Sequence, residues 1–434
     1  MRGPDPRPPG GRTLNAIACA WLVLAALLVG TAPAAAQQPP SVDAAAWTLI
    51  DARDGERLAA ESPRERRSIA STTKLMTAYL ALRDLPLDRK LEVPPYQAAP
   101  AESVAGLTAG ERLTVRDLLT AMMLPSANDA AATVAVGVAG GEDAFVGEMN
   151  DAAAELGLSG TSYANPIGLD DPANYSTATD LAELAKVLRG DKRFREIVSQ
   201  TEATLESGAM PRTVVTRNTL MLSDPTVDGI KTGHTTAAGY VLVASAKRHG
   251  VPLISVVLGA PSEAGRDAAS EELLDYGYSL YESRSPFRAD EALASVDVRY
   301  EDEPLELLAA KALPVQARED QRLRASVDAP AELEGPIERG EKVGSATVTL
   351  DGDTVGRVPL LAAAAVAEPT IVDKVGGPPV VVAAVVLLLV ILLGIALALR
   401  HRSRLRRDAE SSPEERIMRR QERHRRRKNG GEDG

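Results

Sequence analysis

Apolar residues are concentrated in two long uncharged runs, one near each end of the chain. The first run, residues 14–30, follows three arginines and is followed by small residues up to Ala36. A basic start, an apolar centre and an Ala-x-Ala site are typical of a secretory signal peptide, so residues 1–36 are predicted to be a cleaved leader. The second run, residues 380–399, is long enough for a helix to cross a hydrocarbon core of about 30 Å and predicts one transmembrane helix.

Between these runs, apolar residues recur at helical spacing in some segments and alternate in others. A hairpin is predicted first, with strands at 47–50 and 57–60 around the turn Asp54-Gly55. The later helices are predicted in the following segments: a helix from Ser71, a helix capped by Thr114 and ended by Pro125, helices at 129–138 and 142–156, a helix capped by Thr179 that ends near Leu188, and a helix at 267–283. Strands are predicted at 227–235, 239–246 and 253–259. This order predicts an α+β fold with helices packed on an antiparallel sheet.

The pattern changes beyond the last of these helices. Residues 37–285 are predicted to form one domain. From residue 292, short alternating runs separated by Pro and Gly predict a small all-β domain at 292–367, followed by a linker at 368–379. The residues after the apolar run, 400–434, form a charged tail.

Charge is distributed unevenly along the chain, whose net charge is −11. The tail at 400–434 has thirteen Lys and Arg residues against seven Asp and Glu residues, so the body between the leader and the tail is strongly acidic. An acidic body argues against nucleic acid as a partner. Basic residues that flank a membrane span stay on the cytoplasmic side. The tail is therefore predicted to be cytoplasmic, and the body is predicted to lie outside the cell membrane.

Cysteine and histidine exclude several kinds of site. Cys19 is the only cysteine and lies in the predicted leader, so the mature protein would have no disulfide, no cysteine nucleophile and no thiolate metal site. The four histidines are scattered without the spacing of metal ligands. No metal and no cofactor are predicted.

Ser71 and Lys74 supply the first candidate chemistry. Residues three apart on a helix are neighbours, so the Ser71 hydroxyl is expected beside the Lys74 amine. A serine hydroxyl becomes a good nucleophile when a base removes its proton, and a neutral lysine can be that base. Alone, this spacing is more often a helix cap followed by a solvated lysine.

Two further motifs change that balance. Ser126-Ala127-Asn128 and Lys231-Thr232-Gly233 follow in order along the chain. Together with Ser-x-x-Lys, they resemble the motif set of penicillin-binding proteins and serine β-lactamases. Residues 161–171 and 228–235 and Tyr240 resemble low-molecular-mass D-alanyl-D-alanine carboxypeptidases of the serine type. Residues 327–330 and 335–341 resemble that family's C-terminal β domain. The chain departs from these families in having Ser-Ala-Asn where β-lactamases have Ser-Asp-Asn, and a true span where many carboxypeptidases have an amphipathic anchor helix.

The resemblance implies a penicillin-binding-protein or β-lactamase-like catalytic domain and a role for each motif residue. Ser71 would form an acyl-enzyme with the peptidoglycan stem peptide, Lys74 would be the base, and Ser126 would pass a proton to the leaving amine. The implied substrate-binding residues are Asn128, Lys231, Thr232, Gly233, His234 and Thr235. Arg217 and Arg266 are candidates for a second contact to the substrate carboxylate, because a guanidinium suits that anion.

The sequence thus predicts a membrane-anchored bacterial carboxypeptidase that removes the terminal D-alanine from stem pentapeptides and is acylated by β-lactam antibiotics. Three alternatives stay open. The same fold could act as a D,D-endopeptidase on cross-links or as a β-lactamase, for which Glu183 occupies the interval where a deacylating acid would stand. The chain could also be a non-catalytic receptor or scaffold that keeps the fold.

Overall fold

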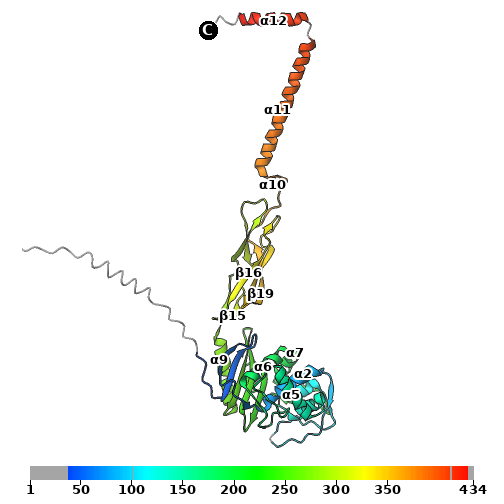
Figure 1. The fold of residues 1–434 in the computed structure, drawn as a ribbon, viewed down its shortest axis with the longest axis vertical. Helices are drawn as coiled ribbons and strands as arrows, with labels where there is room; N and C mark the ends of the chain where they lie inside the picture. The colour runs from blue at the N-terminus through cyan, green and yellow to red at the C-terminus, as the bar shows by residue number, and fades with distance from the viewer. Residues whose placement is uncertain (1–37, 101, 411–412, 429–434) are drawn as a thin grey trace, which may run out of the picture. The chain divides into compact units, whose positions relative to one another are not determined.

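The computed structural model describes residues 38–100, 102–410 and 413–428, which are drawn in colour in Figure 1. They form two compact units. The first unit runs to Ser283 and includes residues 316–320, and the second comprises residues 284–315 and the described residues from 321 onward. The predicted leader, residues 1–36, lies outside the described residues.

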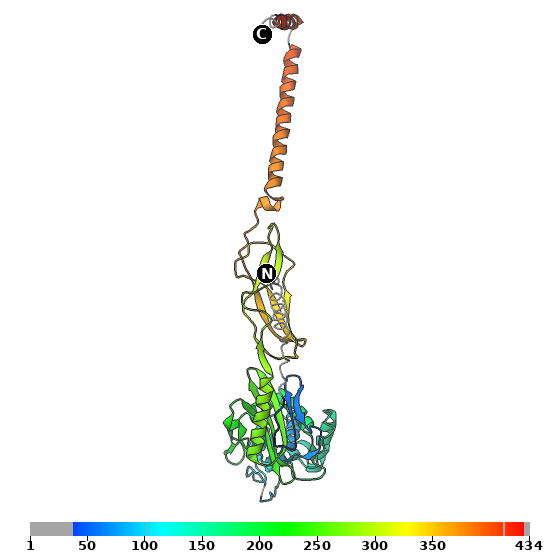
Figure 2. The ribbon, with the colours of Figure 1, turned by 90° about the vertical axis from the view of Figure 1, so that its left-hand side faces the viewer.

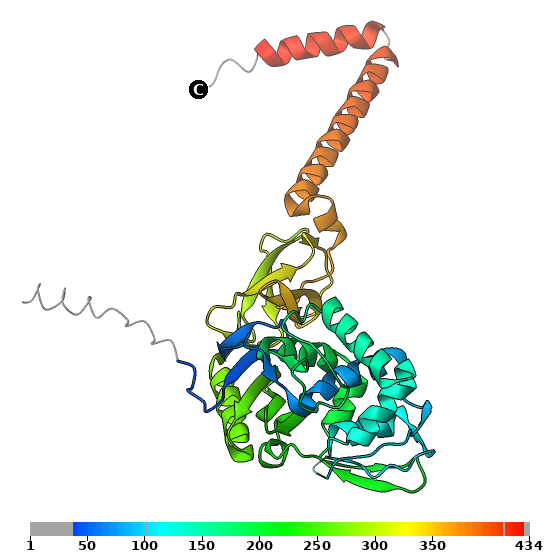
Figure 3. The same cartoon turned by 60° about the horizontal axis from the view of Figure 1, so that its bottom comes forward.

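An antiparallel sheet of five strands forms the centre of the first unit. Its strand order is β2-β1-β11-β10-β9. The strands span Ala46–Asp51 (β1), Arg57–Glu61 (β2), Val227–Thr235 (β9), Gly239–Arg248 (β10) and Val251–Ala260 (β11). The N-terminal hairpin, blue in Figures 2 and 3, therefore lies against β11, which comes much later in the chain. The predicted hairpin and the three predicted strands are confirmed.

Helices pack on both faces of this sheet, because alternate residues of a strand point to opposite sides. Ile50, Val243 and Ile254 belong to the large core shared with α2 to α7. Their neighbours Leu49 and Leu253 pack on the other side with residues of α9. The helices are α2 (Lys74–Asp84), α3 (Val115–Met123), α4 (Asn128–Ala139), α5 (Glu142–Glu155), α6 (Ala178–Gly190), α7 (Lys192–Val198), α8 (Leu220–Ser223) and α9 (Glu263–Ser279). The predicted α+β class is confirmed.

Besides the five-stranded sheet, the described residues form four two-stranded antiparallel or short paired sheets. They pair β3 (Arg67–Ser68) with β6 (Tyr175–Ser176), β4 (Lys90–Glu92) with β5 (Arg112–Thr114), β7 (Glu202–Leu205) with β8 (Arg212–Val215), and β12 (Tyr281–Arg284) with β15 (Val315–Arg318).

Two predicted helix starts are wrong, and the capping residues explain both. The hydroxyl of Thr177, not Thr179, accepts a hydrogen bond from the Asp180 amide at 3.1 Å, so α6 begins two residues earlier than predicted. Ser262 caps α9 in the same way at the Gly265 amide, 3.0 Å away, so α9 begins at Glu263 and ends at Ser279. The predicted cap at Thr114 is confirmed, because its hydroxyl accepts from the Asp117 amide at 3.2 Å.

The second unit contains a six-stranded sheet with the order β16-β18-β19-β14-β13-β17. Leu307, Val348 and Leu360 are completely buried in its core. Its strands span Ala292–Val298 (β13), Leu305–Ala309 (β14), Leu323–Asp328 (β16), Glu332–Leu333 (β17), Lys342–Leu350 (β18) and Asp353–Ala362 (β19). The prediction that a small β domain follows the α+β domain is confirmed.

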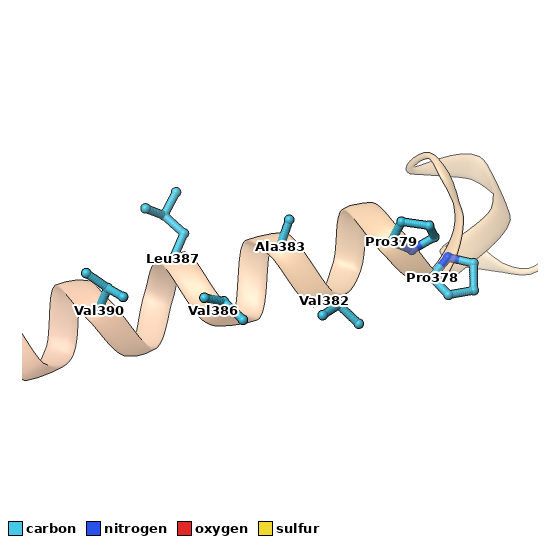
Figure 4. A pocket seen from close by; sticks show the side chains of 7 residues that line it. All are labelled: Pro378, Pro379, Val382, Ala383, Val386, Leu387 and Val390. Carbon is cyan, nitrogen blue, oxygen red and sulfur yellow. The ribbon is translucent and has the colours of Figure 1, made fainter.

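Three helices follow the second sheet: α10 (Ile371–Lys374), α11 (Gly377–Glu410) and α12 (Pro413–Lys428). Among the described residues, α11 is the one helix that is long and apolar enough to cross a membrane. Figure 4 shows its first turns, where Pro378 and Pro379 are followed by projecting apolar side chains such as Val386 and Leu387. The apolar residues predicted as a span, 380–399, lie within this helix.

Candidate active site

Ser71 lies in a short 3-10 turn, Ala70–Thr73, and α2 begins at Lys74. The predicted helix therefore starts as a 3-10 turn rather than as an α-helix at Ser71. Ala70 has a φ angle of 46°, which is an unfavourable backbone conformation for a residue with a β-carbon. The turn leaves Ser71 half-buried, and Lys74 Nζ lies 3.0 Å from its Oγ.

Lys74 is completely buried beneath Ser71. Its Nζ also donates hydrogen bonds to Asn128 Oδ1 at 2.6 Å and to the Ile167 carbonyl oxygen at 2.5 Å. Burial lowers the pKa of Lys74 to about 7, because a low-dielectric surrounding disfavours the charged form. The negative charge of Glu102 opposes this change in pKa, and the positive charge of Arg217 adds to it. A large fraction of Lys74 is therefore neutral near neutral pH.

The second motif lies in the turn between α3 and α4. Ser126 has a φ angle of 68°, and its buried Oγ has no hydrogen-bond partner among the described residues. Asn128 is the first residue of α4, and the Asn128 side chain joins Lys74 to Glu102. A buried hydroxyl without a partner is costly, so Ser126 Oγ is suited to a group that binds from outside.

Sequence reasoning missed a group of residues beyond Asn128. Asn128 Nδ2 donates to Glu102 Oε2 at 2.8 Å, and the hydroxyl of Tyr96 donates to the same carboxylate. Burial raises the pKa of Glu102, but the hydrogen bonds from Asn128 and Tyr96 outweigh it and hold this pKa below its usual value. Asp129 accepts from the amides of Ala105 and Leu107, at 3.0 Å each, and so fastens the loop that carries Glu102 to the start of α4.

Ile167 is placed by a compact loop. The side-chain oxygen of Asn165 accepts hydrogen bonds from the amides of Gly168 at 2.7 Å and Leu169 at 3.1 Å. Gly168 has a φ angle of 89°, and a β-carbon there would come within 2.1 Å of the Ala70 carbonyl oxygen. Only glycine fits at this position, which keeps the Ile167 carbonyl against Lys74.

The third motif lies on β9 and packs against Ser71. A β-carbon on Gly233 would lie 3.0 Å from the Ser71 amide nitrogen. Lys231 is buried, and its Nζ donates to the Thr232 carbonyl oxygen at 2.8 Å. Burial lowers the pKa of Lys231 well below its usual value, and the charges of Lys74 and Arg217 lower it further. The structure therefore brings the three motifs together.

His234 and Thr235 end the same strand. The His234 ring is exposed and stacks on Tyr240, with ring centroids 4.1 Å apart. The hydroxyl of Thr235 donates to Asp170 Oδ1 at 2.6 Å, which ties the end of β9 to the loop that follows Gly168.

The two candidate arginines differ in their surroundings. Arg217 is exposed, and its charge lowers the pKa of both Lys74 and Lys231. Arg266 is buried on α9, and its guanidinium pairs with Asp267 Oδ1 at 2.8 Å. Arg266 also donates to Thr219, and its charge contributes to the lowered pKa of Lys231. Both arginines stay candidate substrate contacts, and the exposure of Arg217 favours Arg217. The described residues contain no group of three or more metal-binding side chains.

Comparison with known families assigns both folded regions. Residues 33–262 match the family model described as D-alanyl-D-alanine carboxypeptidase, of the S11 peptidases. Residues 281–368 match the C-terminal domain of penicillin-binding protein 5. All three motifs lie within the first match.

Individual carboxypeptidases are similar in sequence to this protein over most of its length. The chain is 36% identical to the D-alanyl-D-alanine carboxypeptidase DacC of Escherichia coli, over 79% of this chain and 89% of that protein. It is 30% identical to DacF of Bacillus subtilis, over 74% of this chain and 85% of that protein.

Solved structures show the same likeness. Penicillin-binding protein 5 of Haemophilus influenzae is 30% identical, with a TM-score of 0.54, over 76% of this chain and all of that one. The Streptomyces K15 DD-transpeptidase is 33% identical, also with a TM-score of 0.54, over 56% of this chain and all of that one. With its three motifs gathered around Ser71, the chain belongs to the D-alanyl-D-alanine carboxypeptidase family of serine peptidases.

Proposed function

We propose that this protein is a serine D-Ala-D-Ala carboxypeptidase that cleaves through an acyl-enzyme on Ser71. The observation that carries the proposal is the environment of Lys74. A buried amine with a pKa near 7 lies 3.0 Å from the Ser71 hydroxyl. Such an amine can take a proton at neutral pH, which an ordinary lysine with a pKa of about 10.4 cannot do.

The hydrogen bonds of Lys74 suit its neutral form. A neutral amine has two N–H donors and one lone pair. Asn128 Oδ1 and the Ile167 carbonyl oxygen accept the two N–H groups, which leaves the lone pair for the Ser71 hydroxyl. Ser71 Oγ then attacks the carbonyl carbon between the two D-alanines as its proton passes to Lys74.

Collapse of the tetrahedral intermediate requires a proton on the leaving amine. Ser126 Oγ is a suitable relay, because it is buried and has no partner among the described residues. The proton taken up by Lys74 passes through Ser126 to the amine of the departing D-alanine, and the acyl ester remains on Ser71. Water then attacks the ester carbon as Lys74 takes up a proton from it. Lys74 returns this proton to Ser71 Oγ as the ester bond breaks, which releases the shortened peptide and restores the Ser71 hydroxyl.

Substrate binding is assigned to β9 and its surroundings. Lys231, Thr232 and Arg217 offer two cations and a hydroxyl to the terminal carboxylate. Gly233 contributes by its lack of a side chain, which lets β9 approach the turn that carries Ser71. The backbone amides of Ser71 and His234 are the proposed oxyanion donors, each worth about 3 kcal/mol where charge develops.

The proposed setting is the bacterial cell envelope. Residues 1–36 act as the leader, residues 37–285 as the catalytic domain, residues 292–367 as the β domain, and residues 380–399 as the span that holds the enzyme in the cell membrane. The catalytic domain lies outside and residues 400–434 lie in the cytoplasm. The substrate is the pentapeptide stem of peptidoglycan, and penicillins acylate Ser71 as mimics of its D-Ala-D-Ala end.

The rival activities are less well supported. Glu183, the candidate deacylating acid of a β-lactamase, pairs with Lys186 on α6 at 3.0 Å. An enzymatic function is better supported than a non-catalytic receptor function. Lys74 is buried and has a lowered pKa, which a receptor or scaffold would not need.

The test exposes the soluble body, residues 37–370, to penicillin and follows its intact mass, with peptide mapping of the adduct. We expect one covalent adduct on the peptide that contains Ser71, and release of D-alanine from a pentapeptide ending in D-Ala-D-Ala. Ser71→Ala should abolish both, whereas Ser68→Ala, three residues earlier, should retain both. An unmodified protein, or release only from cross-linked dimers, would contradict the proposal.

A further inference from the structure

Helix α12 carries six of its seven arginines on one face. Successive residues of an α-helix are about 100° apart around the axis. On this spacing, six of its arginines fall within an arc of about 120°. They are Arg416, Arg419, Arg420, Arg423, Arg426 and Arg427. We refer to these six residues as the arginine face. Arg425 lies on the opposite side of the helix, with Ile417, Met418 and Gln421 near it on that side.

The arginine face carries more positive charge than the acids of its own helix can balance. Arginines three or four residues apart repel one another. Over the whole of α12, three glutamates stand against seven arginines and one lysine. The described side chains of α12 are exposed, and Figure 1 shows the helix near the C-terminus. Only Ile417 and Met418 are apolar residues with large side chains, so the helix has too little apolar area to insert deeply into a bilayer.

The connection to α11 keeps this face close to a membrane. The apolar part of α11 ends at Leu399, and the helix continues to Glu410. Eleven further helical residues span about 16 Å, of which the lipid headgroups cover about 6 Å. Two residues then separate Glu410 from the start of α12 at Pro413. The start of α12 therefore stays within about 10 Å of the headgroups, which is close to the distance over which their charge acts, and α12 itself is about 24 Å long.

We propose that the arginine face of α12 binds the anionic lipid headgroups of the leaflet from which α11 emerges. A guanidinium pairs with phosphate through two parallel hydrogen bonds, so a row of arginines suits a surface of phosphodiesters. The span supplies such a surface within reach at all times, whereas a nucleic acid or an acidic protein would have to be recruited from solution. This docking is independent of catalysis and needs only that α11 spans the membrane.

The test uses the full chain in lipid nanodiscs, with Cys19 replaced by serine if the leader is retained and with Gln421→Cys as the one labelling position. Energy transfer from a fluorophore at position 421 to acceptor-labelled headgroups reports how close α12 lies to the bilayer. We expect high transfer in discs that contain phosphatidylglycerol, low transfer in pure phosphatidylcholine, and loss of the signal as NaCl is raised.

Two matched variants test the face itself. Arg423→Gln lies at the centre of the arginine face and Arg425→Gln lies opposite, and both remove one positive charge. Arg423→Gln should lower the ratio of docked to undocked helix about fivefold, and Arg425→Gln much less. Penicillin acylation should be the same in both and verifies that the chain is folded. Equal effects of the two variants, equal transfer in both lipids, or approach of α12 to RNA rather than to phosphatidylglycerol would overturn the proposal.

Discussion

Gly233 packs directly against Ser71: a β-carbon at position 233 would lie 3.0 Å from the Ser71 amide nitrogen and 3.1 Å from the Ile69 carbonyl oxygen. The strand that carries Lys231 is thus fixed against the turn that carries the nucleophile. Lys231 and Ser71 are far apart in sequence, and this close backbone approach is what brings them into one site.

Gly233→Ala should therefore slow acylation of Ser71 by penicillin about tenfold. The added methyl group meets backbone atoms that can yield only by moving Ser71 or β9, and small displacements of a nucleophile are costly. Stopped-flow acylation measures the effect. Gly147→Ala is the matched control, because nothing lies within 4 Å of its added carbon. Acylation of Gly233→Ala at the wild-type rate would show that the close packing has no catalytic importance.

Glu102→Gln should move the pH profile of acylation toward lower pH. The carboxylate raises the pKa of Lys74, so its removal lowers that pKa and makes the neutral amine available at lower pH. Glutamine can still accept the hydrogen bond from Asn128. Glu111→Gln is the control, because Glu111 pairs with Arg212 at 2.9 Å and should not change the midpoint. A midpoint that stays in place or moves toward higher pH would refute a role for Glu102 in setting the Lys74 pKa.

Substitutions of Arg217 and Arg266 should affect different properties, substrate binding in the first case and stability in the second. Arg217→Gln should raise KM about tenfold for a peptide with a free terminal carboxylate, and much less for the corresponding amide. Arg266→Gln should lower thermal stability with little change in KM, because it breaks the pair with Asp267. Steady-state kinetics on the two peptides and thermal unfolding distinguish these outcomes. A carboxylate-specific rise in KM for Arg266→Gln alone would reverse the assignment.

Thr177→Val should destabilise the first unit by about 1 kcal/mol, because valine keeps the shape of threonine but cannot accept from the Asp180 amide. Thr179→Val, at the position that the sequence pattern favours as the cap, should cost less than about 0.5 kcal/mol. Urea unfolding of the soluble body measures both. Equal losses would mean that the start of α6 depends on more than the cap.

The three motifs and the order of elements could be predicted because they are local features of the sequence. Ser71 and Lys74 are neighbours by helical spacing, and segment 239–246 contains a run of β-favouring residues. Helix starts at 179 and 267 were predicted wrongly, because a threonine or serine two to five residues upstream supplied the cap instead. The local sequence pattern does not show which of several nearby serine or threonine residues caps a helix.

The surroundings of Lys74 could not be predicted from local patterns. Glu102 lies in a loop without helical or strand periodicity, and it reaches Lys74 only through Asn128. Ile167 contributes a backbone oxygen, which no side-chain motif can reveal. The left-handed conformation of Ser126 likewise depends on tertiary packing. The identity of the motif residues was readable from the sequence, but the environment that sets the Lys74 pKa was not.

The most direct test of the proposed mechanism is the pH dependence of the acylation rate of Ser71 by penicillin. The rate should rise as pH increases through about 7, because Lys74 must lose its proton before it can accept one from Ser71. A rate that is flat from pH 5.5 to 8.5, or that rises only near the pKa of an ordinary lysine at about 10.4, would contradict Lys74 as the base.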